Sequence, residues 1–111
     1  MPASVSVVVN PPVNQPPVIS NISGTQTSFK PLSAKFTEIS SDPDGYITQW
    51  TWDFGDNTKF TTTNSTLKNP THVYTNPGTY TVTLTVTDDG LPDGTNKKTR
   101  SEEHTSELQS H

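Results

Sequence analysis

The chain has 111 residues, of which 27% are hydrophobic and 16% charged, and its formal net charge is −4. This length suits a single domain, and no apolar run approaches the ~20 residues that a membrane-spanning helix needs. Scarce helix-favouring residues argue against a helical bundle, and an acidic balance without a basic stripe argues against nucleic-acid binding. The absence of Cys excludes a disulfide framework, a thiolate metal site and a Cys nucleophile.

Short alternating segments, separated by turn residues, follow one another through the first half of the chain. Residues 4–9 place valines on one face and predict a strand. Residues 10–15 and the two prolines after them predict a stiff, extended linker. Strands are then expected over 18–22 and 32–36, before a strong turn signal at 41–45.

The second half of the chain carries the clearest strand pattern. Residues 46–54 and 80–87 alternate apolar and polar side chains, and 59–63 predict a polar edge strand between them. Residues 64–70 are expected to form a loop. Strand-length segments punctuated by turns predict an all-β sandwich. The residues expected in its core are Leu32, Ala34, Phe36, Trp52, Phe54, Tyr80, Val82, Leu84 and Val86.

Three motifs point to a known family: Ser-Asp-Pro-Asp-Gly at 41–45, Trp-Asp-Phe-Gly-Asp at 52–56 and Pro-Gly-Thr-Tyr-Thr-Val-Thr-Leu-Thr-Val-Thr-Asp at 77–88. In this order and spacing the chain resembles the PKD (polycystic kidney disease) domain over residues 16–99. The resemblance implies an immunoglobulin-like antiparallel β-sandwich. It also implies a non-catalytic module that recurs, often in tandem, in cell-surface proteins, secreted proteases and polysaccharide-degrading enzymes. Asn57 stands where the family usually has Gly, but Asn tolerates a left-handed backbone.

The two ends of the chain carry separate expectations. Residues 1–9 are interpreted as the remnant last strand of a preceding module, joined by the linker at 10–15, so the chain is expected to be a piece of a tandem array. Residues 100–111 resemble the in-frame translation of a common short-read sequencing-library adapter and predict a non-native tail. The last strand, which should begin near Asn96, is therefore expected to be truncated. Strand 80–87 would then be an exposed edge, and the chain marginally stable or self-associating.

Acidic and amide side chains come from three places that an immunoglobulin-like sandwich brings to one pole. Asp42 and Asp44 lie on a turn, Asp88 ends the strongest strand, and Asn14 precedes the first strand of the domain. Ca²⁺ prefers several hard oxygen ligands, so these four residues form a candidate Ca²⁺ site, with Asp89 assisting. The spacing does not fit an EF-hand. The alternative is turn chemistry with a solvated acidic cluster, and no other cofactor is expected.

The remaining ionisable residues suggest no catalytic residue. Asp53 and Asp56 could pair for glycoside hydrolysis, but both are expected to accept hydrogen bonds from turn N–H groups. His72 has no Cys or His partner and no nucleophile motif beside it, so it is expected to pack or hydrogen-bond within the sandwich with Tyr74. We therefore predict that the chain is not an enzyme.

Two functions remain open for a non-catalytic module. The first is a spacer, presentation or protein/glycan interaction domain, with neighbouring domains of the parent chain and protein or polysaccharide surfaces as partners. The second is a carbohydrate-binding module of a secreted polysaccharide-degrading enzyme or protease. That function needs a flat, exposed aromatic patch, for which Trp50 and Tyr46 are the candidates, so the exposure of these rings separates the hypotheses. By resemblance, an extracellular or cell-surface location is expected, although residues 1–111 show no signal peptide.

Overall fold

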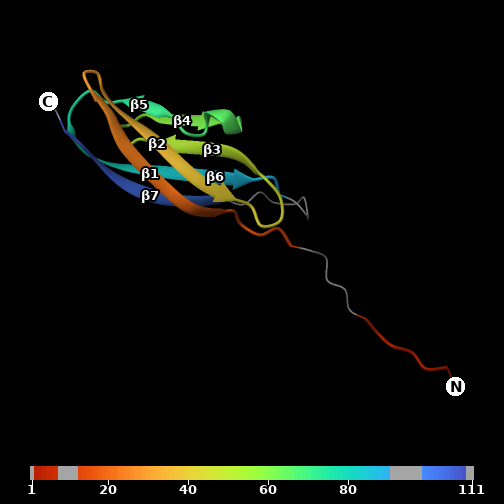
Figure 1. Ribbon diagram of the computed structural model, residues 1–111. Helices are drawn as coiled ribbons and strands as arrows, with labels where there is room; N and C mark the ends of the chain where they lie inside the picture. The colour runs from red at the N-terminus through yellow and green to blue at the C-terminus, as the bar shows by residue number, and fades with distance from the viewer. Residues whose placement is uncertain (1, 8–12, 91–98, 110–111) are drawn as a thin grey trace.

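The computed structural model describes residues 2–7, 13–90 and 99–109, without the side chains of Thr99 and Arg100. Within these ranges the chain forms seven strands and one short 3₁₀ helix (Figure 1). In chain order they are β1 (Val18–Phe29), β2 (Leu32–Ser41), β3 (Ile47–Asp53), β4 (Lys59–Thr62), η1 (Ser65–Leu67), β5 (Thr71–Val73), β6 (Gly78–Asp88) and β7 (Thr99–Leu108). In the part of the chain described here, no helix has the length and apolar character needed to cross a membrane.

The strands form two antiparallel sheets, with the orders β1-β2-β5 and β4-β3-β6-β7. β3 pairs with both β4 and β6, so that Trp52 lies opposite Phe60 on one side and Leu84 on the other. The predicted fold, an all-β sandwich of two antiparallel sheets, is confirmed. β4 and β5 are edge strands of different sheets, and β1 and β7 are the other two edges.

The core lies between the sheets and follows the period-two alternation of the strands. Because successive side chains of a strand point to opposite faces, most apolar residues of β2, β3 and β6 turn inward, and Ile39 of β2 is an exposed exception. Phe36, Trp52 and Leu84 are fully buried, and the ring centroids of Phe36 and Trp52 lie 5.6 Å apart. The Trp52 indole N–H donates to the Lys68 carbonyl at 2.8 Å, so its polar atom is satisfied as well. The core role predicted for Trp52 is therefore confirmed.

The last strand differs from the sequence-based expectation. β7 is not truncated: it pairs with β6 from Thr99, opposite Thr87, to Leu108, opposite Gly78, so β6 is not an exposed edge. The ladder uses main-chain N–H and C=O groups, which any non-proline sequence supplies. Alternation also turns Ser106 inward with Leu108, and both are buried. Strand pairing does not bear on the origin of residues 100–111, and their likeness to adapter sequence stays a prediction.

Other boundaries also differ from the expected ones. β1 and β2 are longer than predicted, since the two strands pair with each other from Val18–Ser41 to Phe29–Leu32. The segment 64–70, expected to be a loop, contains η1, whose N-cap Asn64 accepts a hydrogen bond from the Thr66 N–H. Residues 2–7 form no strand. Residues 8 and 9 of the expected remnant strand and residues 10–12 of the linker lie outside the described residues.

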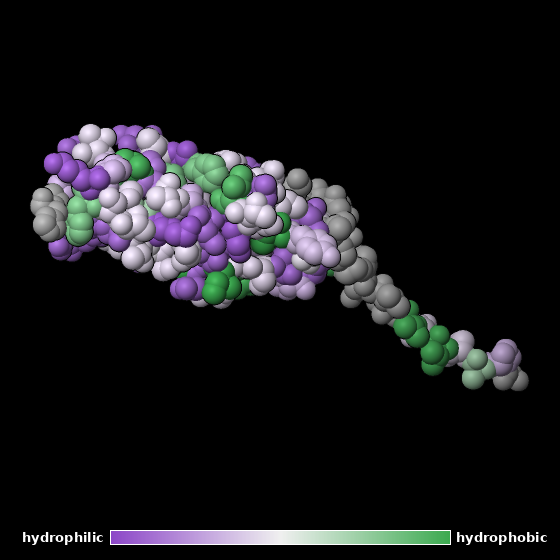
Figure 2. All heavy atoms as spheres, turned by 45° about the horizontal axis from the view of Figure 1, so that its top comes forward, coloured by the Kyte–Doolittle hydropathy of each residue, from purple (hydrophilic) through white to green (hydrophobic). Residues whose placement is uncertain are grey.

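The surface is largely hydrophilic. Figure 2 shows that, on the face in view, hydrophobic residues occur in small separate groups, whereas the N-terminal extension carries a concentrated apolar stretch. Val5 and Val7 are both strongly exposed there. Threonines account for much of the polar surface, because they alternate with buried residues along β6.

Candidate metal centre

The segment before β1, the β2–β3 turn and the end of β6 meet at the pole of the sandwich where the chain enters β1. The group formed by Asn14, Asp42, Asp44, Asp88 and Asp89 is called the acidic pole below. The Asn14 Nδ2 donates to Asp88 Oδ1 at 3.3 Å. The Gln15 N–H donates to Asp44 Oδ2 at 2.7 Å. The structure therefore brings together the three places that the sequence analysis expected to share a pole.

Asp88 is the centre of this group and is fully buried at the end of β6. Its Oδ1 accepts from the Gly90 N–H at 3.0 Å as well as from Asn14, which is 2% exposed. A buried carboxylate needs such donors, because its desolvation is otherwise costly. On the next residue, Asp89 Oδ2 accepts from the Tyr46 N–H at 3.3 Å, which joins the end of β6 to the β2–β3 turn.

Gly45 allows the carboxylates of Asp42 and Asp89 to approach each other. A Cβ atom at this position would lie 2.5 Å from Asp89 Oδ1 and 2.9 Å from Asp42 Oδ2, closer than ordinary contact permits. Both carboxylates thus face the same point beside the turn. The Asp-Pro-Asp-Gly motif therefore has a steric reason for its glycine in addition to turn geometry.

The acidic pole perturbs the ionisation of Asp42. The pKa of Asp42 is raised to about 6 in total, and burial is the largest cause. Asp44 contributes because a proton on Asp42 can be shared with it and because the two charges repel, and Asp88 contributes further repulsion. Both carboxylate oxygens of Asp42 and the Oδ1 of Asp44 are buried and accept no well-aligned hydrogen bond from the described residues, although the main-chain N–H of Asp44 offsets part of the rise in the pKa of Asp42. These oxygens are therefore held in a costly environment.

This arrangement offers hard oxygen donors to a cation, but it is not a preformed metal cage. Among the described residues, no three His, Cys, Asp or Glu side chains are grouped so as to hold a metal ion as they stand. Ca²⁺ accepts six to eight oxygens in flexible geometry, including carbonyl oxygens and water. A Ca²⁺ ion at the acidic pole would therefore need these side chains to move and would need further oxygen ligands from carbonyl groups or water.

Asp53, Asp56 and His72, which the sequence analysis weighed as catalytic candidates, are used in turns and packing. Asp53 Oδ1 accepts from the Gly55 N–H at 3.1 Å, and Asp56 Oδ1 from the Thr58 N–H at 3.2 Å, as expected for turn residues. The His72 Nε2 lies 2.8 Å from Asp56 Oδ2. Burial raises the pKa of Asp56, but hydrogen bonds from His72 and Thr58 outweigh it and hold the pKa below its usual value.

The aromatic platform that the carbohydrate-binding alternative needs is not formed by Trp50 and Tyr46 together. Tyr46 is 77% exposed on the β2–β3 turn, but Trp50 is only 5% exposed. Trp50 lies on the inward face of β3 with Trp52, because side chains two residues apart in a strand share a face. The proposed pair of exposed rings is thus reduced to Tyr46. The structure also shows a feature that the sequence analysis missed, a recess between β4 and β5, which depends on how two sheet edges are placed in space.

Comparison with known proteins agrees with this architecture. Residues 14–105 match the family model of the PKD domain. The chain belongs to the PKD domain family. This PKD domain is 38% identical over 81 residues to the Pre-pro-metalloprotease PrtV of Vibrio cholerae serotype O1, an alignment that covers 73% of the chain but 8% of the protease. The chain therefore spans less than a tenth of that relative.

Solved structures of similar domains share the fold. The PKD1 domain of Vibrio anguillarum Epp superimposes with a TM-score of 0.70 at 30% identity, covering 88% of this chain and 99% of that one. A structure described for the promiscuous specificity of carbohydrate-binding modules of the β-sandwich superfamily gives a TM-score of 0.68 at 31% identity, covering 89% and 36% of the two chains. These comparisons place the PKD domain among the non-catalytic modules of larger multidomain proteins.

Proposed function

We propose that this PKD domain is a Ca²⁺-stabilised spacer and presentation module of an exported multidomain protein. Ca²⁺ binds the acidic pole through Asp42, Asp44 and Asp88, assisted by Asn14 and Asp89. The observation that carries the proposal is the burial of three carboxylate oxygens, on Asp42 and Asp44, that accept no well-aligned hydrogen bond from the described residues. A cation beside them would remove the cost of burying these charges.

Ca²⁺ at this position would also set the direction in which the chain enters the domain. Asn14 and Gln15 already contact Asp88 and Asp44, so the last residues before β1 are attached to the acidic pole. A bound ion would add a further link between these residues and the β2–β3 turn. Extracellular modules bind Ca²⁺ with Kd values of about 10⁻⁴–10⁻³ M, the range we expect for this site. The likeness to a pre-pro-metalloprotease supports an extracellular or cell-surface location.

The proposal is tested by thermal unfolding of the chain in millimolar Ca²⁺, in millimolar Mg²⁺ and in chelator. Because only the folded state binds the ion, about 10 mM Ca²⁺, a ten- to hundredfold excess over a Kd of about 10⁻⁴–10⁻³ M, should stabilise the domain by about 1.4–2.7 kcal/mol. Asp42→Asn should abolish the shift. Asp53→Asn, which alters a turn aspartate outside the acidic pole, is the matched control and should keep it. Identical midpoints of thermal unfolding in Ca²⁺ and in chelator would show that the acidic pole binds no Ca²⁺ and that its side chains only stabilise turns.

Carbohydrate binding is a second candidate function, favoured by the likeness to the carbohydrate-binding-module structure and by the exposed ring of Tyr46. An exposed aromatic face can stack on a sugar, and Tyr46 is anchored through its own N–H to Asp89. Co-sedimentation with insoluble polysaccharides should then show binding that Tyr46→Ala removes. Equal retention of the wild-type chain and the variant would contradict this function.

The chain is also expected to lack hydrolytic activity of its own. Asp53 and Asp56 are occupied in turns, and the carboxylate of Asp56 is bonded to His72, so neither is placed as a free general acid. Incubation with peptide and glycan substrates should give no turnover. Turnover that Asp53→Ala abolishes without unfolding the domain would overturn this expectation.

A further inference from the structure

Two segments of the chain, residues 21–23 and 64–66, fit the Asn-X-Ser/Thr pattern of N-linked glycosylation, and the proposed function uses neither. At residues 69–71 a proline stands between the asparagine and the threonine, which excludes the pattern there. Where the pattern is met, the side-chain amide of the asparagine can receive an oligosaccharide in an exported protein. The two sites have different surroundings in the folded domain, and these surroundings distinguish them.

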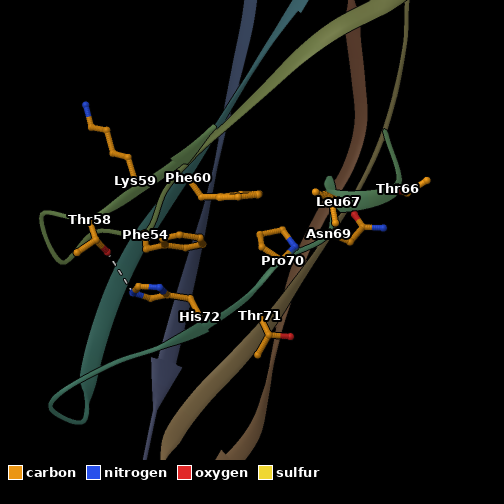
Figure 3. Close-up of a pocket in the computed structure, with 10 residues that line it drawn as sticks. All are labelled: Phe54, Thr58, Lys59, Phe60, Thr66, Leu67, Asn69, Pro70, Thr71 and His72. Atoms are coloured by element: carbon orange, nitrogen blue, oxygen red, sulfur yellow. Dashed lines mark hydrogen bonds between the residues drawn. The ribbon is translucent and has the colours of Figure 1, made fainter. Parts of the chain in front are cut away.

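The site at 64–66 lies on the surface, in the connection between β4 and β5. Asn64, Ser65 and Thr66 are all exposed, and η1, which begins there, contains no buried residue. Figure 3 shows Thr66 at the outer end of a recess of about 480 Å³, with its side chain pointing away from the phenylalanine rings. An enzyme can therefore approach the site without displacing a buried side chain.

The Asn64 side chain is held through its oxygen, which leaves its nitrogen free. Its Oδ1 accepts from the Thr66 N–H at 3.0 Å and from the Thr66 hydroxyl at 2.7 Å. Its Nδ2 makes no hydrogen bond with any residue that the structure describes. An N-linked sugar is attached to this nitrogen, so the atom that would react is one that the domain does not use.

Few interactions would be lost if this segment opened. The Leu67 N–H donates to the Asn64 carbonyl at 2.9 Å, and the Asn64 N–H donates to the Thr62 Oγ1 at 3.0 Å. Local opening costs least free energy where few hydrogen bonds and few buried apolar contacts are broken. An enzyme that must fit its acceptor into a cleft of its own is therefore favoured here, as proteases are at exposed polar loops.

The site at 21–23 belongs to β1 and is held more firmly. Asn21 is exposed, but it pairs with Ile39 within the long β1–β2 ladder. The Ser23 hydroxyl lies 2.6 Å from the Thr37 hydroxyl, so the group that the pattern requires is bonded to the neighbouring strand. Access for an enzyme would require part of the ladder to open, which costs more free energy than opening a surface turn.

We propose that Asn64 is the N-glycosylation site of the folded domain and that Asn21 is not modified once β1 has paired with β2. The co-substrate is an oligosaccharide linked through pyrophosphate to a lipid. The Nδ2 of Asn64 attacks C1 of the first sugar and forms the N–C bond, while the C1–O bond breaks and the lipid pyrophosphate leaves with the electron pair. Nδ2 gives one proton to a base of the transferase, and no group is oxidised or reduced. This inference does not depend on Ca²⁺ binding.

The test incubates the folded full chain with a single-subunit oligosaccharyltransferase and its lipid-linked oligosaccharide. Intact mass and peptide mapping should show one glycan, on Asn64, with an initial rate at Asn21 that is at least about tenfold lower. An unstructured peptide that contains Asn-Ser-Thr confirms that the transferase is active. A glycan on Asn21 instead, or an unmodified chain beside a modified peptide, would overturn the proposal.

Variants and peptides separate the sequence pattern from the fold. Asn64→Gln and Thr66→Ala should each abolish the modification, whereas Ser65→Ala keeps the pattern and should be modified like the wild-type chain. Two synthetic peptides, residues 17–27 and 60–70, present the same sites without the fold. The ratio of the rates at the two sites should be at least about tenfold larger in the folded chain than between the peptides. An equal ratio would show that the fold does not select Asn64 and would refute the proposal.

Discussion

Glu38 has a side chain with no exposed surface, yet it carries a carboxylate. Lys68 Nζ lies 2.8 Å from its Oε1, and the Asn69 side chain accepts from the Glu38 N–H at 3.0 Å, so the η1–β5 connection is attached to β2 by polar contacts. Lys68 also supplies the carbonyl that accepts from Trp52. One ion pair thus holds the segment that covers the core tryptophan.

Lys68→Met should lower the free energy of unfolding by about 3 kcal/mol, because it leaves Glu38 buried without its counter-charge. The double variant Glu38→Gln/Lys68→Met should recover much of this loss, since no uncompensated charge remains. Urea denaturation monitored by tryptophan fluorescence measures the free energy of unfolding of the single and the double variant. Lys59→Met, which removes an exposed lysine, is the control and should change stability by less than about 0.5 kcal/mol. A loss in the control as large as that in Lys68→Met would contradict the role of the pair.

Asp42 makes stability depend on pH. Its pKa is raised to about 6 in the folded domain, so its contribution to stability is fully present below the unfolded pKa near 4 and is lost as the pH rises through about 6. In chelator, the free energy of unfolding should therefore fall by about 1–2 kcal/mol between pH 4 and 6, with solvent screening taken into account. Asp42→Asn should flatten this slope, and Asp53→Asn should preserve it. An unchanged slope in Asp42→Asn would exclude Asp42 as its source.

At the scale of elements, β1 and β7 come from different sheets and approach each other closely at Gly24. A Cβ at Gly24 would lie 2.7 Å from a ring carbon of Phe36 and 2.9 Å from the Ser106 Oγ. Farther along, Gln26 and Gln109 exchange hydrogen bonds, in which the Gln26 Nε2 donates at 2.8 Å and the Gln109 N–H donates at 3.0 Å. These contacts close one side of the sandwich, whereas the β4–β5 side stays open.

Gly24→Ala should destabilise the domain by about 1–3 kcal/mol, although alanine is an ordinary strand residue, because the added methyl group overpacks against Phe36. Differential scanning calorimetry should show the lower midpoint. Thr25→Ala, at an exposed neighbouring position of β1, is the control and should lower stability by well under 1 kcal/mol. Equal midpoints for Gly24→Ala and the wild-type chain would show that β1 and β7 separate without cost.

On the scale of the whole molecule, the ladder between β6 and β7 decides whether the fold is complete. It runs along both strands and leaves β6 with a neighbour on each side. Residues 100–108 therefore supply most of a structural strand in this chain, whatever their origin. The chain was expected to be marginally stable or self-associating because β6 would lack a neighbour. Since β6 is paired with β7, this reason no longer holds.

Deletion of residues 100–111 should cost most of the domain's stability of about 5–15 kcal/mol, because it exposes the length of β6 and the core beside it. The full chain should unfold in one cooperative transition. Circular dichroism and size-exclusion chromatography should show the shortened chain unfolded or self-associated. A shortened chain that stays folded and monomeric would mean that β7 adds little to the sandwich.

Local patterns predicted the parts of this structure that depend on alternation and turn chemistry. Val82, Leu84 and Val86 were expected in the core and are fully buried. Asn57 was expected to tolerate a left-handed backbone and has φ 70°. The residues of the acidic pole could be located from sequence because turns and strand ends of a sandwich meet at its poles.

Other features depend on partners that no local pattern reveals. β7 is polar, and its pairing comes from the main chain of β6 rather than from its own side chains. β5 is a three-residue strand that exists through its register with β2. The recess between β4 and β5 depends on where two edges from different sheets come to lie. Tertiary placement, rather than propensity, decides all three.

The entry and exit of the chain lie at opposite ends of the sandwich (Figure 1). β1 begins where Val18 pairs with Ser41, beside the acidic pole, and β7 ends where Leu108 pairs with Gly78 at the other pole. A pulling force applied through the chain would therefore run along the strands and load the β1–β2 and β6–β7 hydrogen bonds together in shear. Such ladders must break many bonds at once rather than unzip one at a time. The domain is thus built to transmit tension along a chain without lengthening.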